Sequence, residues 1–192
     1  MPNPNPAALE FLLTRRSFPA KLMRGPVPSR ADLLPLLTAA ARCPDHGKLE
    51  PWRFIVLEKP SMARLADLAE ARARATAGTE EKIAKGRGQF DLGALAVVVV
   101  ASPKGVDKVP QIEQTLSAGA VCLGLVNAAQ AAGWGACWLT GWVSHDRSFV
   151  ETGLGLAPQE FVAGIIHIGT ETSAPAPRTR PDIAALTTWA DA

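Results

Sequence analysis

The polar loop between residues 42 and 52 carries the side chains best suited to binding a small molecule. Its sequence is Arg42-Cys43-Pro44-Asp45-His46-Gly47-Lys48-Leu49-Glu50-Pro51-Trp52. Each proline disfavours the α conformation at the residue before it, so we expect a stiff, extended or turned loop. A stiff polar loop between a helix and a strand is a common place for a binding site. The composition also fits an ordinary surface loop that ends in a packed tryptophan, and the loop alone leaves both interpretations open.

A second candidate site is Arg15-Arg16-Ser17, at the end of a predicted first helix. That helix is expected to begin at the Asn5 cap and Pro6 and to run to about Thr14. Two guanidinium forks and a hydroxyl suit the several oxygens of a phosphate group. The alternative is that the arginines only complement the negative end of the helix dipole.

Composition places the chain among globular proteins with one domain. The chain has 192 residues, with 47% hydrophobic and 20% charged residues. We expect a single domain over 1–192, with an N-terminal extension at 1–6 and a C-terminal tail at 171–192. A net charge of +2 argues against a nucleic-acid partner.

Cysteine spacing and hydropathy predict a cytoplasmic protein without a membrane partner. Cys43, Cys122 and Cys137 show neither metal-ligand spacing nor an even disulfide set, so we expect reduced thiols and no metal site. The first residues lack the apolar segment of a secretory signal. The longest apolar region, 116–129, is too short to cross a bilayer.

Hydrophobic periodicity and capping signals predict alternating helices and strands, hence an α+β or α/β sandwich with helices on both faces of a small sheet. The helix at 113–132 has no charge after Glu113, so it should be buried or lie in a subunit interface. We expect a short helix at 144–152 capped by Ser144, a solvated helical flap at 79–93, and a buried, hydrogen-bonded His167. The expected helices are 5–14, 29–42, 61–77, 79–85, 113–132 and 144–152, and the expected strands are 53–57, 94–101, 136–141 and 161–169.

Several motifs together resemble the nitroreductase family, in its small YdjA-like branch. Arg15-Arg16-Ser17 resembles the N-terminal signature of the family, and Pro44 to Trp52 resembles its flavin loop. The resemblance covers about residues 7–170, with the motifs in order. The other matching segments are Lys108-Val109-Pro110, Glu113-Gln114, Ser117-Ala118-Gly119, Gly133-Trp134-Gly135, Trp138 and Ile168-Gly169-Thr170.

The resemblance implies a nitroreductase-like α+β fold with a small, mostly antiparallel sheet and a long interface helix. It also implies a homodimer with two FMN molecules at its interface, each touching both chains. Arg15, Arg16 and Ser17 match positions that hold the FMN phosphate and ribityl chain. The other matching flavin positions are Arg42 and His46 from the partner chain, and Trp138, Leu139 and Thr140.

The resemblance further implies NADPH or NADH as electron donor, and the sequence does not separate the two. The segment matched to nicotinamide nucleotide binding is Ala128-Ala129-Gln130-Ala131-Ala132-Gly133. Two residues depart from the family pattern: Glu50 replaces the usual Gln, and Leu139 stands where a close relative carries Arg. Both changes raise the electrostatic cost of an anionic reduced flavin. Arg178 or Arg180 is a candidate addition to the phosphate site.

The implied activity is ping-pong two-electron reduction, in which NAD(P)H reduces FMN and a nitroaromatic or quinone-like acceptor then oxidises it. The flavin carries the redox chemistry, so no catalytic side chain is expected. A non-catalytic flavin-binding or storage protein of the same fold is the alternative. A hydrolase is disfavoured because adjacent Asp45 and His46 side chains point apart in an extended loop, and Ser17 lacks a nucleophile elbow.

Overall fold

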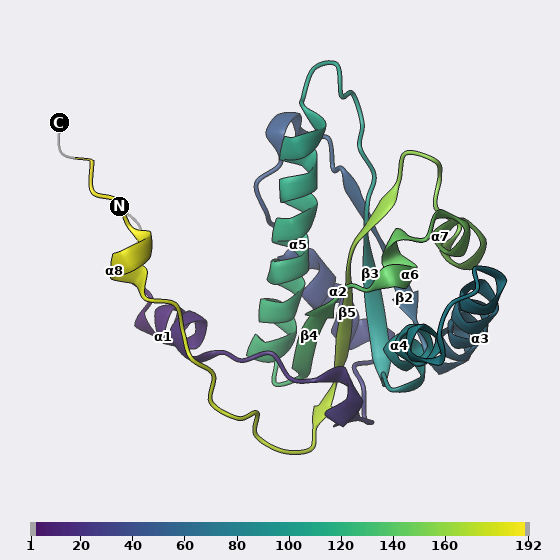
Figure 1. Cartoon of the computed structure of the whole chain (residues 1–192). Coiled ribbons are helices and arrows are strands. Elements are labelled where there is room, and N and C mark those ends of the chain that lie inside the picture. Colours follow the sequence, from purple (N-terminus) through teal and green to yellow (C-terminus); the bar gives the residue numbers. More distant parts are fainter. Residues whose placement is uncertain (1–2, 191–192) are drawn as a thin grey trace.

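The protein is a five-stranded antiparallel sheet between two layers of helices, as a computed structural model of residues 3–190 shows (Figure 1). β3 lies between β2 and β5, and β1 and β4 also pair with β5. This confirms the predicted α+β class. The strands are β1 (Met23–Arg24), β2 (Trp52–Leu57), β3 (Leu95–Ala101), β4 (Gly135–Leu139) and β5 (Phe161–Glu171).

The central strand β3 is buried along its whole length. Val97 pairs with Val56 of β2 on one side and Ile166 of β5 on the other. Its side chains alternate between the two faces, so Val97 and Val98 enter separate hydrophobic cores. A continuous run of apolar, mostly β-branched residues suits a strand covered on both faces, and the predicted strand at 94–101 is confirmed.

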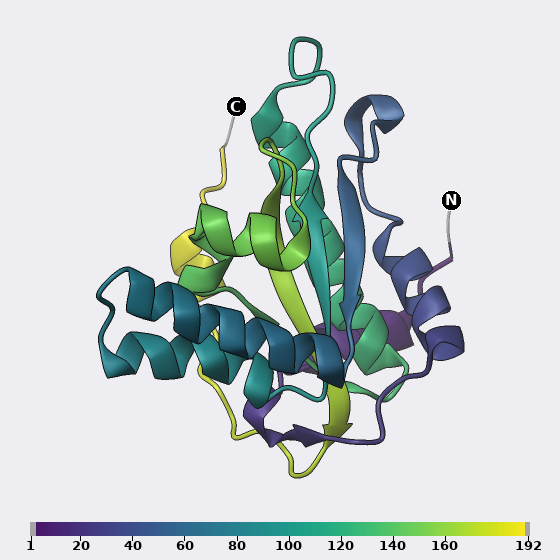
Figure 2. The ribbon, with the colours of Figure 1, turned by 90° about the vertical axis from the view of Figure 1, so that its right-hand side faces the viewer.

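Helices cover both faces of the sheet (Figure 2). α2 and α5 pack on one face around Leu125 and Ile166. α3, α4, α6 and α7 cover the other face around Leu65 and Phe149. The helix bounds are α1 (Pro6–Thr14), α2 (Arg30–Ala40), α3 (Lys59–Ala75), α4 (Glu80–Asp91), α5 (Gln111–Ala131), α6 (Trp142–His145), α7 (Arg147–Leu154) and α8 (Ile183–Leu186).

The long helix α5 has one buried face and one apolar exposed face. Val121 and Leu125 are fully buried against the sheet. Ile112, Leu116 and Leu123 lie on the opposite side and are 63%, 66% and 48% exposed. Within one chain only one face of α5 is therefore buried. The opposite, exposed face is available for contact with a partner.

The predicted flap at 79–93 is wrong, because α4 continues to Asp91 and packs on the sheet through Phe90. Gly86 lies inside the helix, where the Trp142 ring occupies the place of a side chain. A Cβ on Gly86 would lie 2.6 Å from that ring. Trp142 also donates its indole N–H to the carbonyl of Lys82 at 3.0 Å. Gly86 thus provides a close packing position between α4 and Trp142.

The predicted helix at 144–152 is two helices, α6 and α7, divided at Asp146. The Asp146 carboxylate accepts a hydrogen bond from the Phe149 N–H at 2.7 Å, so Asp146 caps α7. Ser144 lies inside α6 and makes no capping hydrogen bond. Asp146 also receives hydrogen bonds from Arg72 of α3, which holds this cap against the neighbouring helix.

His167 is buried as predicted but lacks the predicted hydrogen bonds. Its side chain is fully enclosed in β5, and among residues 3–190 neither ring nitrogen has a partner. Burial, with the nearby charge of Lys59, lowers the pKa of His167 to about 4. The ring is therefore neutral at physiological pH.

Both ends of the described chain stand away from the sheet (Figure 1). α1 has the predicted cap, with the Asn5 side chain accepting from Ala8 N–H, yet none of its residues is buried. Leu13 of α1 is 67% exposed and Trp189 of the tail 84% exposed. The proposed division into extension, domain and tail stays a prediction, and residues 1, 2, 191 and 192 lie outside the described part.

No helix between residues 3 and 190 combines the length and apolar content that crossing a membrane requires.

A buried carboxylate fixes the turn that leads into β5. Glu160 is 7% exposed at its side chain and accepts two hydrogen bonds of 2.7 Å from Arg53 of β2. It also accepts from the Ala157 N–H, while Arg147 donates to three carbonyls of the same turn. The hydrogen bond from Arg53 is the main cause that lowers the pKa of Glu160 to about 2, against the effect of burial.

Glu160 should therefore make the fold sensitive to acid. Its folded pKa lies below its unfolded value, so its contribution is complete above about pH 4.5 and is lost as the pH falls towards 2. We expect a loss of about 2 kcal/mol, reduced by solvent screening because Arg53 is partly exposed. Urea unfolding between pH 5 and 2.5 should show this slope in the parent. An equal slope in Glu160→Gln would contradict it.

Candidate functional site

Three arginines meet beside the end of α1. Arg15 donates through Nε to the side-chain oxygen of Gln130 at 2.9 Å and through Nη2 to Ser17 Oγ at 3.2 Å. Arg180, from the tail, donates to the Arg15 carbonyl at 3.1 Å. Burial, followed by the charges of Arg180 and Arg16, lowers the pKa of Arg15. Among the described residues, no carboxylate lies within 4 Å of any of these guanidinium groups, which makes this cluster suited to an anion.

A hollow of about 460 Å³ opens beside this arginine cluster. Gln130 also donates to the carbonyls of Arg16 and Ala136, so one side chain fixes both the arginine segment and the start of β4. Within the predicted nucleotide segment 128–133, only Gln130 makes such side-chain contacts, and Ala129 is buried core. The hollow is lined by Phe11, Arg15, Arg16, Gln130, Gly133, Trp134, Glu171 and Pro175.

The polar loop at 42–52 is held in a strained conformation. Gly47, Lys48 and Glu50 have φ angles of 74°, 53° and 47°. A positive φ costs little at glycine, whereas at lysine or glutamate it is unfavourable and persists only where surrounding contacts enforce it. The Asp45 carboxylate supplies two of these contacts by accepting from the N–H groups of Leu49 and Glu50 at 3.1 and 2.8 Å.

Helix α5 supplies the remaining support for the loop. Ser117 is 7% exposed; its hydroxyl donates to the Pro44 carbonyl at 2.7 Å and accepts from Trp52 Nε1 at 3.2 Å. Gln114, one turn earlier, bonds the backbone of Lys104 and Val109, and Lys104 in turn donates to the Glu50 carbonyl. The loop is thus a fixed part of the fold.

His46 points to the first turn of α5. Its Nδ1 lies 2.6 Å from Oε2 of Glu113, and the two side chains are 63% and 45% exposed. Arg42 is exposed at the start of the same loop. The loop therefore presents a cation and an imidazole to solvent at the N-terminal end of α5.

The two predicted groups of flavin contacts lie at opposite ends of α5 within one chain. Glu113 contacts His46 at one end, and Gln130 contacts Arg15 at the other. At 1.5 Å per residue the two α5 positions are about 25 Å apart. The structure of one chain does not bring these side chains together.

The third predicted group, on β4, lies between these ends. The Trp138 ring is 41% exposed and lies across Gly164 of β5, where no Cβ fits, and near Gly119 and Cys122 of α5. Leu139 packs beside the buried cluster around Phe18, while Thr140 is exposed. The apolar residue at position 139 therefore belongs to the packing beneath the site.

The arrangement is incompatible with a Ser-His-Asp triad in one chain. Asp45 binds backbone N–H groups and Glu113 contacts His46, so Asp45 does not orient the imidazole. Ser17 is bonded to Arg15 at the other end of α5. Among residues 3–190 no group of three His, Cys, Asp or Glu side chains forms a candidate metal site.

The thiols are free, as predicted. Cys122 and Cys137 are buried, and Cys43 is partly exposed. Burial raises the pKa of Cys122 to about 12 and that of Cys137 to about 11, so both remain protonated and unreactive.

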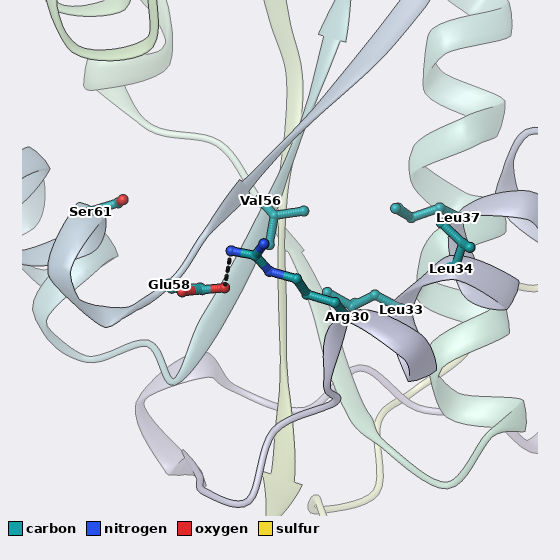
Figure 3. A pocket seen from close by; sticks show the side chains of 7 residues that line it. All are labelled: Arg30, Leu33, Leu34, Leu37, Val56, Glu58 and Ser61. Carbon is teal, nitrogen blue, oxygen red and sulfur yellow. Dashed lines mark hydrogen bonds and ion pairs between the residues drawn. The ribbon is translucent and has the colours of Figure 1, made fainter.

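Another hollow, of about 370 Å³, lies between α2 and β2, away from the predicted site (Figure 3). Leu33, Leu34 and Leu37 line its helical side. Arg30 crosses its mouth to Glu58, with 3.3 Å between the charged atoms. Because this arginine already has a carboxylate partner, the hollow lacks the uncompensated charge of the arginine cluster.

Sequence reasoning did not find the contacts that position the site. Ser117, Glu113 and Gln130 all project from α5, and each contacts a residue at least 65 positions away. The motif similarity named Glu113 and Ser117, and Gln130 as part of the nucleotide segment, but it assigned none of them a positioning contact. The tail residue Arg180 was a candidate, and the structure places it against Arg15, whereas Arg178 makes no described hydrogen bond there.

A family model decides the relationship. The model described as "Nitroreductase family" matches residues 12–170, which include the arginine pair, the polar loop and β4. The chain belongs to the nitroreductase family. It is therefore an oxidoreductase by family, as the motifs implied.

Curated relatives agree with this membership. The chain is 33% identical over 163 residues to "Putative NAD(P)H nitroreductase YdjA" of Escherichia coli K12, covering 85% of this chain and 87% of that protein. It is 37% identical over 165 residues to "Putative NAD(P)H nitroreductase" of Haemophilus influenzae, covering 85% and 88%.

Solved structures share the fold. A nitroreductase-like family protein from Bacillus cereus superposes with a TM-score of 0.78 at 22% identity and covers all of both chains. A protein named FMN-dependent nitroreductase from Clostridium difficile gives a TM-score of 0.62 at 22% identity, covering 89% of this chain and 91% of its own. The nitroreductase-like fold is thus confirmed.

Ser117 should be the main support of the polar loop. Ser117→Ala leaves the Pro44 carbonyl and the Trp52 N–H without their partner in a partly buried place, at a cost of about 1–2 kcal/mol. Urea unfolding measures this loss. Thr115→Ala is the matched control because its hydroxyl bonds only the Gln111 carbonyl of its own helix, and it should change stability by less than about 0.5 kcal/mol. Equal effects of the two substitutions would refute the assigned role.

Proposed function

We propose that this protein is an FMN-dependent NAD(P)H oxidoreductase that works as a homodimer with one FMN at each end of its interface. The observation that carries the proposal is the cluster of Arg15, Arg16 and Arg180 without a carboxylate partner among the described residues. A phosphate dianion would neutralise this charge, and the guanidinium forks match its oxygens.

The rest of the chain also fits a flavin mononucleotide. Ser17 offers a hydroxyl beside Arg15, suited to the ribityl chain. Trp138 offers a partly exposed aromatic wall that lies against Gly164. Arg42 and His46 offer polar contacts for the pyrimidine edge of the ring, from the far end of α5.

A twofold axis across α5 would bring the arginine cluster of one chain close to the polar loop of its partner. Antiparallel pairing of two α5 helices sets the N-terminal half of one against the C-terminal half of the other. His46 of one chain then approaches Arg15 of its partner, which the separation of about 25 Å along one helix prevents within a chain. The exposed stripe of Ile112, Leu116 and Leu123 supplies apolar surface for this contact.

In this proposal the side chains bind and orient the coenzyme, and the coenzyme carries the redox chemistry. When bound, FMN would supply the two-electron redox chemistry: a hydride would pass from NAD(P)H to the flavin, and two electrons with their protons would then pass to an electron-poor acceptor such as a nitroaromatic or quinone. The arginine cluster fixes the phosphate end, and Trp138 limits one face. The other face of the flavin ring would stay open, so that the electron donor and the acceptor could bind there in turn. The segment 128–133 borders the arginine hollow and is the proposed nucleotide contact.

Charge removal from the arginine cluster should weaken FMN binding. Arg15→Gln and Arg16→Gln should each raise the Kd for FMN by about tenfold or more, since a hydrogen bond to a charged group contributes about 1.5–3 kcal/mol. Arg180→Gln should weaken binding by less, and the exposed Arg178→Gln is the matched control without effect. Flavin fluorescence titration measures each Kd.

Riboflavin lacks the phosphate and tests the cause of the effect. Its affinity should be unchanged by Arg15→Gln and Arg16→Gln if these side chains bind the phosphate. Equal losses for riboflavin and FMN would contradict the phosphate assignment. A parent protein that takes up no added FMN would overturn the proposed function.

Anaerobic mixing with NADPH or NADH separates an enzyme from a flavin-storage protein. We expect loss of the flavin absorbance at about 450 nm, followed by recovery when a quinone or nitroaromatic is added. Glu50, exposed near the polar loop's end, and the absence of a cation at Leu139 favour slow reduction. A stable yellow protein that neither donor bleaches would identify the storage alternative.

A further inference from the structure

The hydrogen bond between His46 and Glu113 is not needed to hold the polar loop in place. Glu113 Oε2 lies 2.6 Å from Nδ1 of His46, although both side chains are largely exposed. The loop backbone is already held by Asp45, Ser117 and Lys104. Among residues 3–190 the Glu113 carboxylate is the only hydrogen-bond partner of the imidazole, and Nε2 has none.

A carboxylate at one ring nitrogen determines what the other nitrogen can do. An imidazole that donates Nδ1–H to a carboxylate keeps its proton on Nδ1 and its ring in a fixed plane. Nε2 is then an acceptor in the neutral ring and a donor in the imidazolium. Without the carboxylate, an exposed histidine rotates and exchanges tautomers.

The strained loop aims His46 at this carboxylate. His46 directly precedes Gly47 and Lys48, both with positive φ. Such angles at a non-glycine residue cost about 1–3 kcal/mol and gather where geometry serves a site. The resulting turn carries the imidazole to the first turn of α5, with Nε2 left for a ligand.

We infer that Glu113 is a positioning residue, which fixes the tautomer and plane of His46 so that Nε2 meets the flavin ring held by the partner chain. The inference rests on the proposed function. Glu113 itself does not touch the coenzyme. The competing explanation is that Glu113 merely stabilises the positive N-terminal end of α5, as acidic first-turn residues commonly do.

Three substitutions separate the two roles. Glu113→Ala removes both. Glu113→Gln keeps a hydrogen-bond acceptor at the same reach but removes the charge that favours the helix end. Glu113→Asp keeps the charge in the first turn but is too short to reach His46. Glu81→Ala is the matched control, because Glu81 is also a first-turn acid in an exposed ion pair, 2.7 Å from Lys85.

Ring-nitrogen NMR of the protein without FMN reads the tautomer directly. The chain has three histidines, and His46→Ala assigns the His46 signals. We expect a proton fixed on Nδ1 in the parent and in Glu113→Gln, and an exchanging mixture of the two tautomers in Glu113→Ala and Glu113→Asp. Undiminished Nδ1 protonation in Glu113→Ala would overturn the inference.

FMN titration tests the consequence for binding. Glu113→Ala and Glu113→Asp should raise the Kd by about fivefold, Glu113→Gln should restore most of the loss, and Glu81→Ala should have no effect. In a His46→Ala background, Glu113→Ala should change nothing further. An undiminished loss in that background, or restoration by Asp rather than Gln, would assign Glu113 to the helix alone.

The two levels of failure are distinguishable. If the parent binds no FMN, the proposed function fails and the inference falls with it. If the parent binds FMN but the Glu113 and Glu81 variants behave alike, the proposed function stands and only the role of Glu113 is refuted.

Discussion

Uncompensated positive charge beside the end of α1 is the constraint on which the account depends. Arg15 is partly buried, is bonded to Gln130 and Ser17, and stands near Arg16 and Arg180. Burial, followed by repulsion from Arg180 and Arg16, disfavours the charged Arg15 and lowers its pKa. Such a cluster would be stabilised by an anion, because among the described residues no carboxylate lies within 4 Å of its guanidinium groups, although Glu171 lines the same hollow. The tail contributes to the same cluster, so an anion there would also order Arg180.

Helix α5 sets the positions of the polar loop and of the arginine cluster relative to each other. Its buried face packs on the sheet, its N-terminal half supports the polar loop through Ser117 and Glu113, and Gln130 near its C-terminal end holds Arg15. One rigid helix therefore fixes two half-sites at a constant separation. In the proposed homodimer, a second copy in antiparallel orientation would complete both halves at once and would cover the apolar exposed face of this helix.

Local signals made much of the fold predictable. The Asn5 cap and the β-branched run of β3 are both visible in a few consecutive residues. The errors came from contacts between distant residues. The α4 helix continues through Gly86 because Trp142 packs there. For the site, motifs located both half-sites, but Gln130 and Arg15 are 115 positions apart, and no local pattern predicts that contact.

The FMN content of mixed dimers tests the shared site most directly. One chain would carry Arg15→Glu with Arg16→Glu, and the other Arg42→Ala with His46→Ala, with neither variant binding FMN alone. If each site takes its arginines and its polar loop from different chains, the mixed dimer has one intact site and should bind about one FMN. If both groups acted within one chain, every site would be damaged, and a mixed dimer without FMN would contradict the account.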